Sequence, residues 1–320
     1  MSSNSNDFGR AFEYACIIGL KDRIESIRPV QLDERSVEAA RRAWEVVDDA
    51  MKHSFATAAA AFMDTLFAAE PLILERENAD DVVELSINRD TDAEAGDVRD
   101  VVIQRGQIHW EIGLSMKHNH FAAKHSRLSD QIDFGKKWYG VPCDAAYWNA
   151  IMPLFDALRG LQKRGVRWKD VPDKDTAIYV PLLTAFKNEL QRAYEQDSAL
   201  VSRLISYLLG VKDFYKVVAI DNQRMTEFQS FNLRGELNQS GKRAKAATYI
   251  PLSALPTEII QLRFKPNSTN IVELYLNNGW SLSFRIHSAS TIVEPSLKFD
   301  VQFLGVPSSI LTINCMWKSF

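Results

Sequence analysis

Cysteine is scarce in this chain, and the few cysteines lie far apart. The 320 residues contain three, Cys16, Cys143 and Cys315, and no two of them have the CxxC spacing of a zinc or redox site. A small secreted protein held by disulfides would carry more cysteines at closer spacings. The sequence therefore indicates neither a disulfide framework nor a structural zinc site.

Long apolar runs and a leader segment are also lacking. Residues 1–7 have neither the basic nor the apolar region of a signal peptide. The most apolar stretch, residues 54–69, contains Asp64 and is shorter than the roughly 20 residues that a membrane-spanning helix needs. We therefore expect a cytoplasmic protein without a membrane partner, in which this alanine-rich stretch forms a buried helix.

An overall excess of basic residues is absent, but charge is unevenly distributed. The formal net charge is −3 and the pI is near 6.1, whereas domains that bind nucleic acid often have a pI above about 9. Residues 75–100 carry a net charge of −7, so the remainder carries +4, and residues 116–137 contain five basic and two acidic residues. An acidic strand region beside a basic segment suits a metal site that acts on a polyanion. The alternative is that both are ordinary solvated faces.

The order of predicted elements favours the mixed α/β class. Apolar spacing predicts a helix that Asn6 or Asp7 caps, with Phe8 and Phe12 on its buried side. Further helices are predicted over about residues 36–51, 54–69, 119–129 and much of 145–210. Strands are predicted over residues 82–87, 98–103, 108–116, 215–220, 259–264, 271–276, 281–287 and 298–304. Residues 165–175 interrupt the helical pattern and are a candidate boundary between two regions.

The densest group of candidate reactive residues lies between residues 96 and 137. Residues 98–103 and 108–116 form a predicted hairpin, and alternate side chains of a strand share a face, so Ser115 and Lys117 lie on one side. An acidic residue of the preceding strand can lie beside them. Carboxylates there would hold Mg²⁺, and the lysine would stabilise a charged phosphorane or help to orient and deprotonate the attacking water.

The position of the turn decides which acid lies beside Ser115. If the turn centres on Gly106, Asp97 falls opposite Ser115. Asp100 directly precedes Val101 and opens its strand, and a shifted turn or a bulge would bring it opposite Ser115. We prefer Asp100 and keep Asp97 as the alternative, while a structural ion pair with a nearby arginine would explain either acid without catalysis.

The predicted helix after Lys117 carries a basic stripe. His120, Lys124 and Arg127 have i, i+4, i+7 spacing and would share one helical face, from which they would contact phosphates. His118 and Asn119 are further candidates for phosphate contacts. The run His118-Asn119-His120 also resembles a fragment of an HNH nuclease, although adjacent positions do not fit the hairpin-and-helix arrangement of such a metal site.

Two other groups of residues are candidates for reading bases. Arginine and lysine can donate hydrogen bonds to guanine O6 and N7 in the major groove. Such residues occur in a compact loop after Asn238 and in the C-terminal strands. They are Lys242, Arg243 and Lys245 in the loop, and Arg285, His287 and Lys298 in the strands. The alternative is that each is an ordinary solvated residue.

Several of these stretches together resemble the HaeIII family of type II restriction endonucleases. The run from Glu111 to His120, continued over residues 123–129, carries the resemblance, as do residues 9–15, 96–101, 284–287 and 293–300. The resemblance implies a mixed-sheet PD-(D/E)xK restriction-endonuclease-like core flanked by helices, with a strand-rich C-terminal region. It also implies Mg²⁺-dependent cleavage of double-stranded DNA at GGCC. On this basis residues 1–170 are the expected catalytic core, and residues 171–320 are the expected DNA-recognition part of a homodimer.

One position departs from the nuclease motif. The second carboxylate, two residues before the lysine, is replaced by Ser115. Glu111 is six residues from Lys117, roughly 20 Å along an extended strand, so it is a weak candidate for the missing ligand. Glu13 and Asp130 are other possible donors. The departure keeps open a non-catalytic DNA-binding module on a decayed nuclease fold. A repair-type nuclease without a fixed site, on the same core, is a separate alternative.

Overall fold

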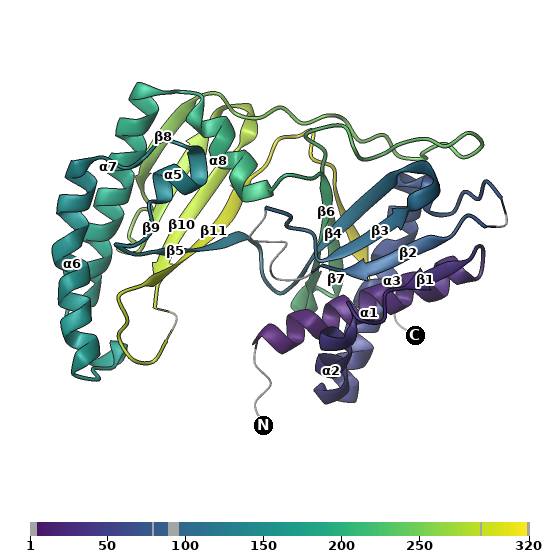
Figure 1. The fold of residues 1–320 in the computed structure, drawn as a ribbon, viewed down its shortest axis with the longest axis horizontal. Coiled ribbons are helices and arrows are strands. Elements are labelled where there is room, and N and C mark those ends of the chain that lie inside the picture. Colours follow the sequence, from purple (N-terminus) through teal and green to yellow (C-terminus); the bar gives the residue numbers. More distant parts are fainter. Residues whose placement is uncertain (1–4, 79, 89–95, 289, 319–320) are drawn as a thin grey trace. The chain divides into compact units, whose positions relative to one another are not determined.

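The chain forms two units, each built from separate stretches of sequence (Figure 1). The computed structural model describes residues 5–78, 80–88, 96–288 and 290–318. Unit 1 comprises Met1–Phe121, Gly210–Ser253 and Ser308–Phe320, and unit 2 comprises Ala122–Leu209 and Ala254–Pro307. The backbone therefore passes between the units after residues 121, 209, 253 and 307. The expected boundary between residues 170 and 171 lies inside unit 2.

Unit 1 contains a seven-stranded mixed sheet, which confirms the predicted α/β class. The strand order is β1-β2-β3-β4-β6-β7-β12. The pairs β1–β2 and β4–β6 are parallel and the others are antiparallel. Bounds are Val30–Leu32 (β1), Val83–Ile87 (β2), Val101–Arg105 (β3), Trp110–His118 (β4), Phe214–Ile220 (β6), Met225–Phe231 (β7) and Thr312–Met316 (β12). β1, β7 and β12 are strands that the sequence pattern did not predict.

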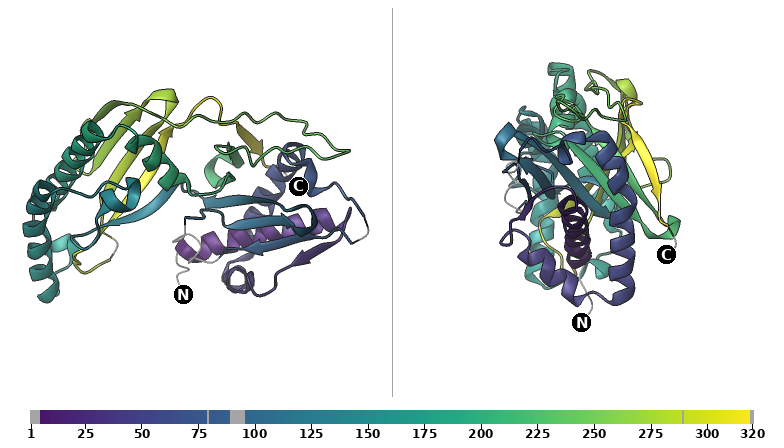
Figure 2. Two further views of the ribbon diagram at one scale, coloured as in Figure 1. Left: turned by 45° about the horizontal axis from the view of Figure 1, so that its top comes forward. Right: turned by 90° about the vertical axis from the view of Figure 1, so that its right-hand side faces the viewer.

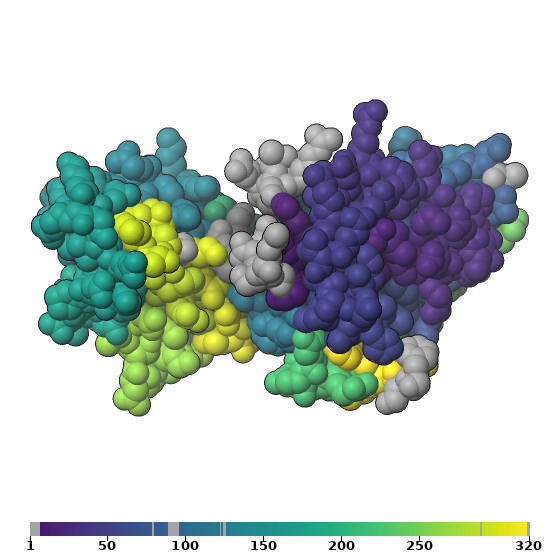
Figure 3. Space-filling model, turned by 90° about the horizontal axis from the view of Figure 1, so that it is seen from below, coloured from purple at the N-terminus to yellow at the C-terminus, as the bar shows by residue number. Residues whose placement is uncertain are grey.

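Helices α1 (Ser5–Glu25), α2 (Glu38–Val46) and α3 (Asp49–Ala69) belong to unit 1 and form much of the surface seen in Figure 3. The single helix predicted over residues 36–51 is divided, because the Asp48 side chain accepts a hydrogen bond from the Met51 amide and begins α3. The alanine-rich helix is confirmed and is followed by the short η1 (Pro71–Ile73). No helix in the described ranges is long and apolar enough to cross a membrane.

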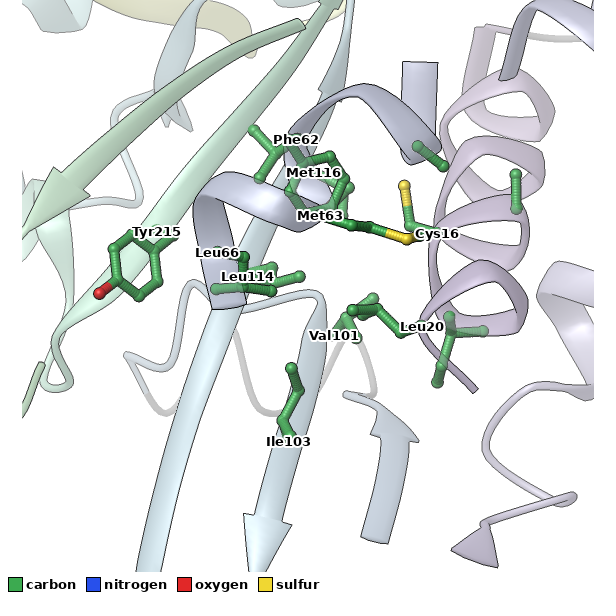
Figure 4. Packing of buried hydrophobic residues seen from close by; sticks show 14 of the residues in the cluster. Cys16, Leu20, Phe62, Met63, Leu66, Val101, Ile103, Leu114, Met116 and Tyr215 are labelled. Atoms are coloured by element: carbon green, nitrogen blue, oxygen red, sulfur yellow. The ribbon is translucent and has the colours of Figure 1, made fainter. Parts of the chain in front are cut away.

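The main core of unit 1 lies between these helices and one face of the sheet. Leu114 and Met116 of β4 belong to the same buried cluster as Met63 of α3 and Cys16 of α1 (Figure 4). Burying such side chains stabilises the fold by about 1.5–3 kcal/mol each. Because side chains alternate along a strand, Ser115 is directed to the face of the sheet opposite these helices.

Unit 2 contains a five-stranded antiparallel sheet covered on one face by helices (Figure 2). The aromatic rings of Trp138 and Phe186 from the helices pack on Phe284 and Phe299 of the sheet. The strand order is β5-β11-β10-β9-β8, with bounds Ala122–Leu128 (β5), Ile259–Phe264 (β8), Ile271–Leu276 (β9), Ser281–His287 (β10) and Leu297–Gly305 (β11). The helices are α5 (Phe134–Tyr139), α6 (Ala145–Lys163), α7 (Val180–Gln196) and α8 (Leu200–Leu209).

The predicted interruption of the helical region is confirmed. Two short helical segments, η3 (Trp168–Asp170) and η4 (Asp175–Tyr179), lie between α6 and α7. The turn between β9 and β10 is formed by η6 (Asn277–Gly279). Asn278 and Gly279 both have positive φ, a conformation that asparagine and glycine adopt more readily than other residues.

The prediction of a helix over residues 119–129 is wrong. Residues 122–128 form β5, which pairs along β11 in an antiparallel register that sets Arg127 opposite Lys298. A strand has a period of two residues, so the i, i+4, i+7 spacing of His120, Lys124 and Arg127 does not define a common face. Long-range pairing with β11 provides backbone hydrogen bonds that override the local helical pattern.

Candidate active site on the β3–β4 hairpin

The register of the β3–β4 hairpin brings Asp100 beside Ser115. Val101 pairs with Leu114, and the Asp100 amide donates to the Leu114 carbonyl at 2.8 Å. The turn contains η2 (Gly106–Ile108) and ends at His109, which has a φ of 51°, so its centre lies beyond Gly106. The shifted turn aligns Asp100, not Asp97, with Ser115.

Three donors converge on one carboxylate oxygen of Asp100. The Oδ2 atom accepts hydrogen bonds from the Met116 amide at 2.6 Å, Lys117 Nζ at 2.9 Å and Ser115 Oγ at 3.3 Å. Lys117 Nζ also donates to the Met116 carbonyl at 2.9 Å. The side chains of Asp100 and Lys117 are each 27% exposed, which leaves the pair accessible to a ligand.

The donor set on this face fits a magnesium ion that keeps most of its water. Across the described residues, no group of three or more histidine, cysteine, aspartate or glutamate side chains could hold a metal ion. Mg²⁺ needs fewer protein ligands than that, because it is usually held by one or two carboxylates together with waters and substrate phosphate oxygens. With three donors on Oδ2, the second oxygen of Asp100 accepts no hydrogen bond from the described part of the chain, so it is available as a ligand.

Asp97 and Glu111 are held in a different cluster, centred on Arg99. The Arg99 guanidinium is 6% exposed and donates to Asp97 at 2.6 Å and to Glu111 at 3.2 Å. Its side chain crosses Gly113, where an added Cβ would lie 2.1 Å from the Arg99 Cδ, so this position requires glycine. Glu111 also accepts from Lys212 at 3.1 Å.

These charges affect the ionisation of Glu111. Burial alone raises the pKa of this carboxyl, but the hydrogen bond from Gln104 and the charges of Arg99 and Lys212 outweigh it. The pKa of Glu111 is therefore below its ordinary value. The structure thus places Asp97 and Glu111 together as partners of Arg99, while Asp100, Ser115 and Lys117 form a separate group.

His118 and Asn119 fasten the end of β4 to the turn after β6. The Asp221 Oδ2 atom lies 2.7 Å from His118 Nε2 and accepts from Asn119 Nδ2 at 2.9 Å. Phe8 and Phe55 pack edge-on against the His118 ring. His118 therefore lies on the helix side of the sheet, whereas Lys117 is directed to the other side.

The other residues that the sequence proposed as acids or phosphate contacts are dispersed. Glu13 lies on α1 near Cys16, whose pKa is raised by burial and then by Glu13. Asp130 belongs to unit 2 and accepts from Arg159 at 2.6 Å. Arg127 donates to Glu294 at 3.3 Å and to Ser296 at 3.1 Å. His120 lies between β4 and β5, and the side chains of Lys124 and His125 lie outside the described part of the structure.

The basic loop after Asn238 belongs to unit 1 and rests on acidic residues. Lys242 forms an ion pair with Glu77 at 3.0 Å, and the Arg243 amide donates to Glu75 at 3.0 Å. Lys245 Nζ donates to the Gly241 carbonyl at 3.3 Å. Lys242 is 79% exposed, so a DNA phosphate could replace Glu77 as its partner.

Glu70 anchors the beginning of this loop from the end of α3. Its buried Oε1 accepts from the Tyr215 hydroxyl at 2.5 Å and from the Asn238 amide at 2.6 Å. Burial raises the pKa of Glu70 to about 7, although the hydrogen bonds from Asn238 and Tyr215 oppose the shift. The folded protein thus holds a proton on Glu70 at pH values where the unfolded chain has released it.

Replacing Glu70 with Gln is therefore expected to stabilise the protein at pH 8 and not at pH 5. Between about pH 4.5 and 7 the unfolded chain ionises Glu70 while the folded protein keeps it protonated, so the free energy of unfolding falls as pH rises through this range. Above it the folded protein carries a buried, ionised Glu70, and the loss of stability is complete. Gln keeps an acceptor without the charge, so the free energy of unfolding at pH 8 should rise by about 1–2 kcal/mol. Urea unfolding at both pH values measures this effect, with the exposed Glu84→Gln as the control. An equal change at pH 5 and pH 8 would contradict it.

The C-terminal candidates lie on the sheet of unit 2. Arg285 is exposed and pairs with Asp300 of β11, and His287 pairs with Lys298. Burial, followed by the positive charge of Arg285, lowers the pKa of His287. Phe284 and Ile286 alternate with these residues and are buried, so Arg285 and His287 lie on the face opposite the helices.

Sequence reasoning missed one charged residue beside the hairpin, Lys216 in β6. It is 6% exposed and pairs in parallel register with Ser115, which puts both side chains on the same face. Burial, and then the nearby Lys117, lowers the pKa of Lys216 to about 8, although Glu227 acts in the opposite direction. The signal that could have found it is a single lysine within an otherwise apolar strand, residues 214–220.

Comparisons with known proteins agree on one family. Residues 9–307 match the model of the HaeIII restriction endonuclease family. The chain is also 44% identical over 320 residues to the type II restriction enzyme HaeIII of Haemophilus aegyptius, an alignment that covers 99% of this chain and all of the relative. No solved structure matches the chain.

Proposed function

The chain belongs to the HaeIII restriction endonuclease family, and from this membership we propose that it is a type II restriction endonuclease that cuts both strands of DNA at GGCC. The observation that carries the proposal is the group of Asp100, Ser115 and Lys117 on one face of β3 and β4, in a chain 44% identical to HaeIII. The reaction is hydrolysis of a phosphodiester bond within a restriction-modification system. We propose the cytoplasm as the place where it acts.

Asp100 and Lys117 have separate roles in the proposed reaction. The second carboxylate oxygen of Asp100, which is not the one that Ser115, Met116 and Lys117 contact, would hold Mg²⁺, and the ion would supply polarisation of the scissile phosphate and of its attacking water. The Lys117 ammonium stabilises the negative charge that develops on the phosphorane or orients the water, since it lies 2.9 Å from Asp100 on an accessible part of the sheet. Ser115 takes the place of the usual second carboxylate and helps to fix Asp100 through the same oxygen as Lys117.

DNA contacts are proposed for basic and polar residues in both units. In unit 1 the basic loop presents Lys242 to solvent, and phosphate would compete with Glu77 for it. In unit 2 Arg285 is exposed on a strand and can donate to guanine. The full proposed set is His118, Asn119, His120, Lys124, Arg127, Lys242, Arg243, Lys245, Arg285 and His287. The double-stranded site GGCC is its own complement, so a homodimer with twofold symmetry is the proposed assembly.

The proposal is tested by incubating phage DNA with the protein and Mg²⁺ and by mapping the cut ends. Discrete fragments with every end inside GGCC are expected, and a duplex with GGTC in place of GGCC, or addition of EDTA, should prevent cutting. Cleavage without fixed ends would instead indicate a repair-type nuclease. Sequence-specific binding without cleavage would indicate a decayed, non-catalytic module, the alternative that Ser115 favours.

A further inference from the structure

Lys216 is a buried cation in the centre of the unit 1 sheet. All seven residues of β6 are buried, and Tyr215 and Val217, on either side of Lys216, belong to the apolar core beneath the helices. Lys216 points to the other face, where Ser115 is its neighbour on β4. A lysine at such a position lowers stability unless its charge is compensated, so its presence calls for a physical explanation.

The contacts of Lys216 compensate its charge only in part. Its Nζ atom donates to the Phe121 carbonyl at 2.8 Å. Among the described residues Lys216 has no carboxylate within ion-pair distance, and the half-buried Glu227 of β7 attracts it only from further away. Lys117 repels it from the neighbouring strand. Two lysines therefore lie close together on this face, and Asp100 is paired with one of them.

We propose that Lys216 is a positioning residue of the nuclease site, which fixes the segment after the catalytic strand and adds positive charge beside Lys117 for the incoming DNA phosphate. Residues 119–121 follow β4 directly, and the hydrogen bond to Phe121 holds the end of this segment. A phosphodiester entering the site supplies the negative charge that Lys216 lacks in the free protein, and this attraction is strong because the surroundings exclude water. The inference rests on the proposed function, since it concerns the same site.

The variant Lys216→Met separates this role from a structural one. Methionine has a similar length but no charge, so removing the buried cation should leave the melting temperature equal to or above that of the native protein. The single-turnover rate of cleavage at GGCC should nevertheless fall by about 10–100-fold, as expected for a residue that supports catalytic groups. Lys216→Arg, which keeps a charged donor, should recover part of this loss. The control is Lys52→Met, on α3, which should retain the native rate.

A second measurement uses the native protein and does not depend on how a variant folds. Titration of Lys216 by NMR, with its signal assigned from the Lys216→Met spectrum, should show its pKa rise by at least about one unit when a GGCC duplex binds in Ca²⁺. A native cleavage rate in Lys216→Met, or a pKa of Lys216 that DNA does not change, would overturn the inference. Failure of the native protein to cut GGCC would instead overturn the proposed function, so the two failures are distinguishable.

Discussion

Replacing Lys117 with Ala is expected to lower the single-turnover rate of DNA cleavage at least about 10³-fold and to leave sequence-specific binding intact. The ammonium of Lys117 is the positively charged donor to Asp100, at 2.9 Å on an accessible part of the hairpin, so its loss removes charge stabilisation from the proposed site of the phosphorane. The residues proposed to read bases lie elsewhere and are unaffected. Cleavage of a labelled GGCC duplex gives the rate, and a gel-shift assay in Ca²⁺ gives the affinity.

Lys52→Ala is the matched control for the loss of a lysine. Lys52 lies on α3, which packs on the face of the sheet opposite Lys117, and is part of a loose ion pair with Asp49 at 3.8 Å. Its replacement should change neither the rate nor the affinity. Unaltered cleavage by Lys117→Ala would remove Lys117 from the site, whereas a loss of both cleavage and specific binding would show that the side chain serves the fold or the DNA interface.

Asp100→Asn is expected to abolish Mg²⁺-dependent cleavage to a similar extent, at least about 10³-fold. Asparagine can still accept hydrogen bonds from Met116 and Ser115, so the hairpin should keep its geometry. It loses the negative charge that Mg²⁺ requires. DNA affinity in EDTA should be unchanged or higher, because a carboxylate that repels phosphate has been removed, and addition of Mg²⁺ should no longer accelerate cleavage.

Asp97→Asn provides the matched comparison, three residues away. Asp97 is a partner of the buried Arg99, so its replacement should lower the free energy of unfolding by about 1–3 kcal/mol and leave the cleavage rate of the folded protein close to native. Metal-dependent rates and urea unfolding of both variants distinguish the two acids. If Asp97→Asn stopped cleavage and Asp100→Asn did not, the assignment of the metal-binding acid would be reversed.

The sequence was sufficient to predict the hairpin but not its register. Alternating apolar residues and Gly106 indicate two strands and a turn, and the structure confirms both strands. The register depends on the backbone of the turn, where η2 and the positive φ of His109 move the centre beyond Gly106. Since positive φ is uncommon for any residue other than glycine, the sequence did not indicate this conformation at His109, and both Asp97 and Asp100 remained possible.

The failures at β5 and Lys216 have a common cause, which is pairing between distant parts of the chain. Residues 122–128 become a strand because β11 lies beside them, and no local feature of their sequence indicates β11 as a partner. Lys216 lies beside Ser115 because β6 pairs in parallel with β4, although the helices of unit 2 separate the two strands in the sequence. Composition and spacing identify which side chains are reactive, whereas the pairing of distant strands determines which of these side chains lie close together.

The discontinuous make-up of unit 1 also determines when the site can form during synthesis. β3 and β4, with Asp100 and Lys117, leave the ribosome before any of the helices of unit 2, while β6, which pairs with β4, begins only at Phe214. β12 (Thr312–Met316) is synthesised after all the other strands of this sheet. A nascent chain that already contains both proposed catalytic residues therefore has β4 paired with β3 alone, so the complete surroundings of the proposed site can form only after β6 has been synthesised.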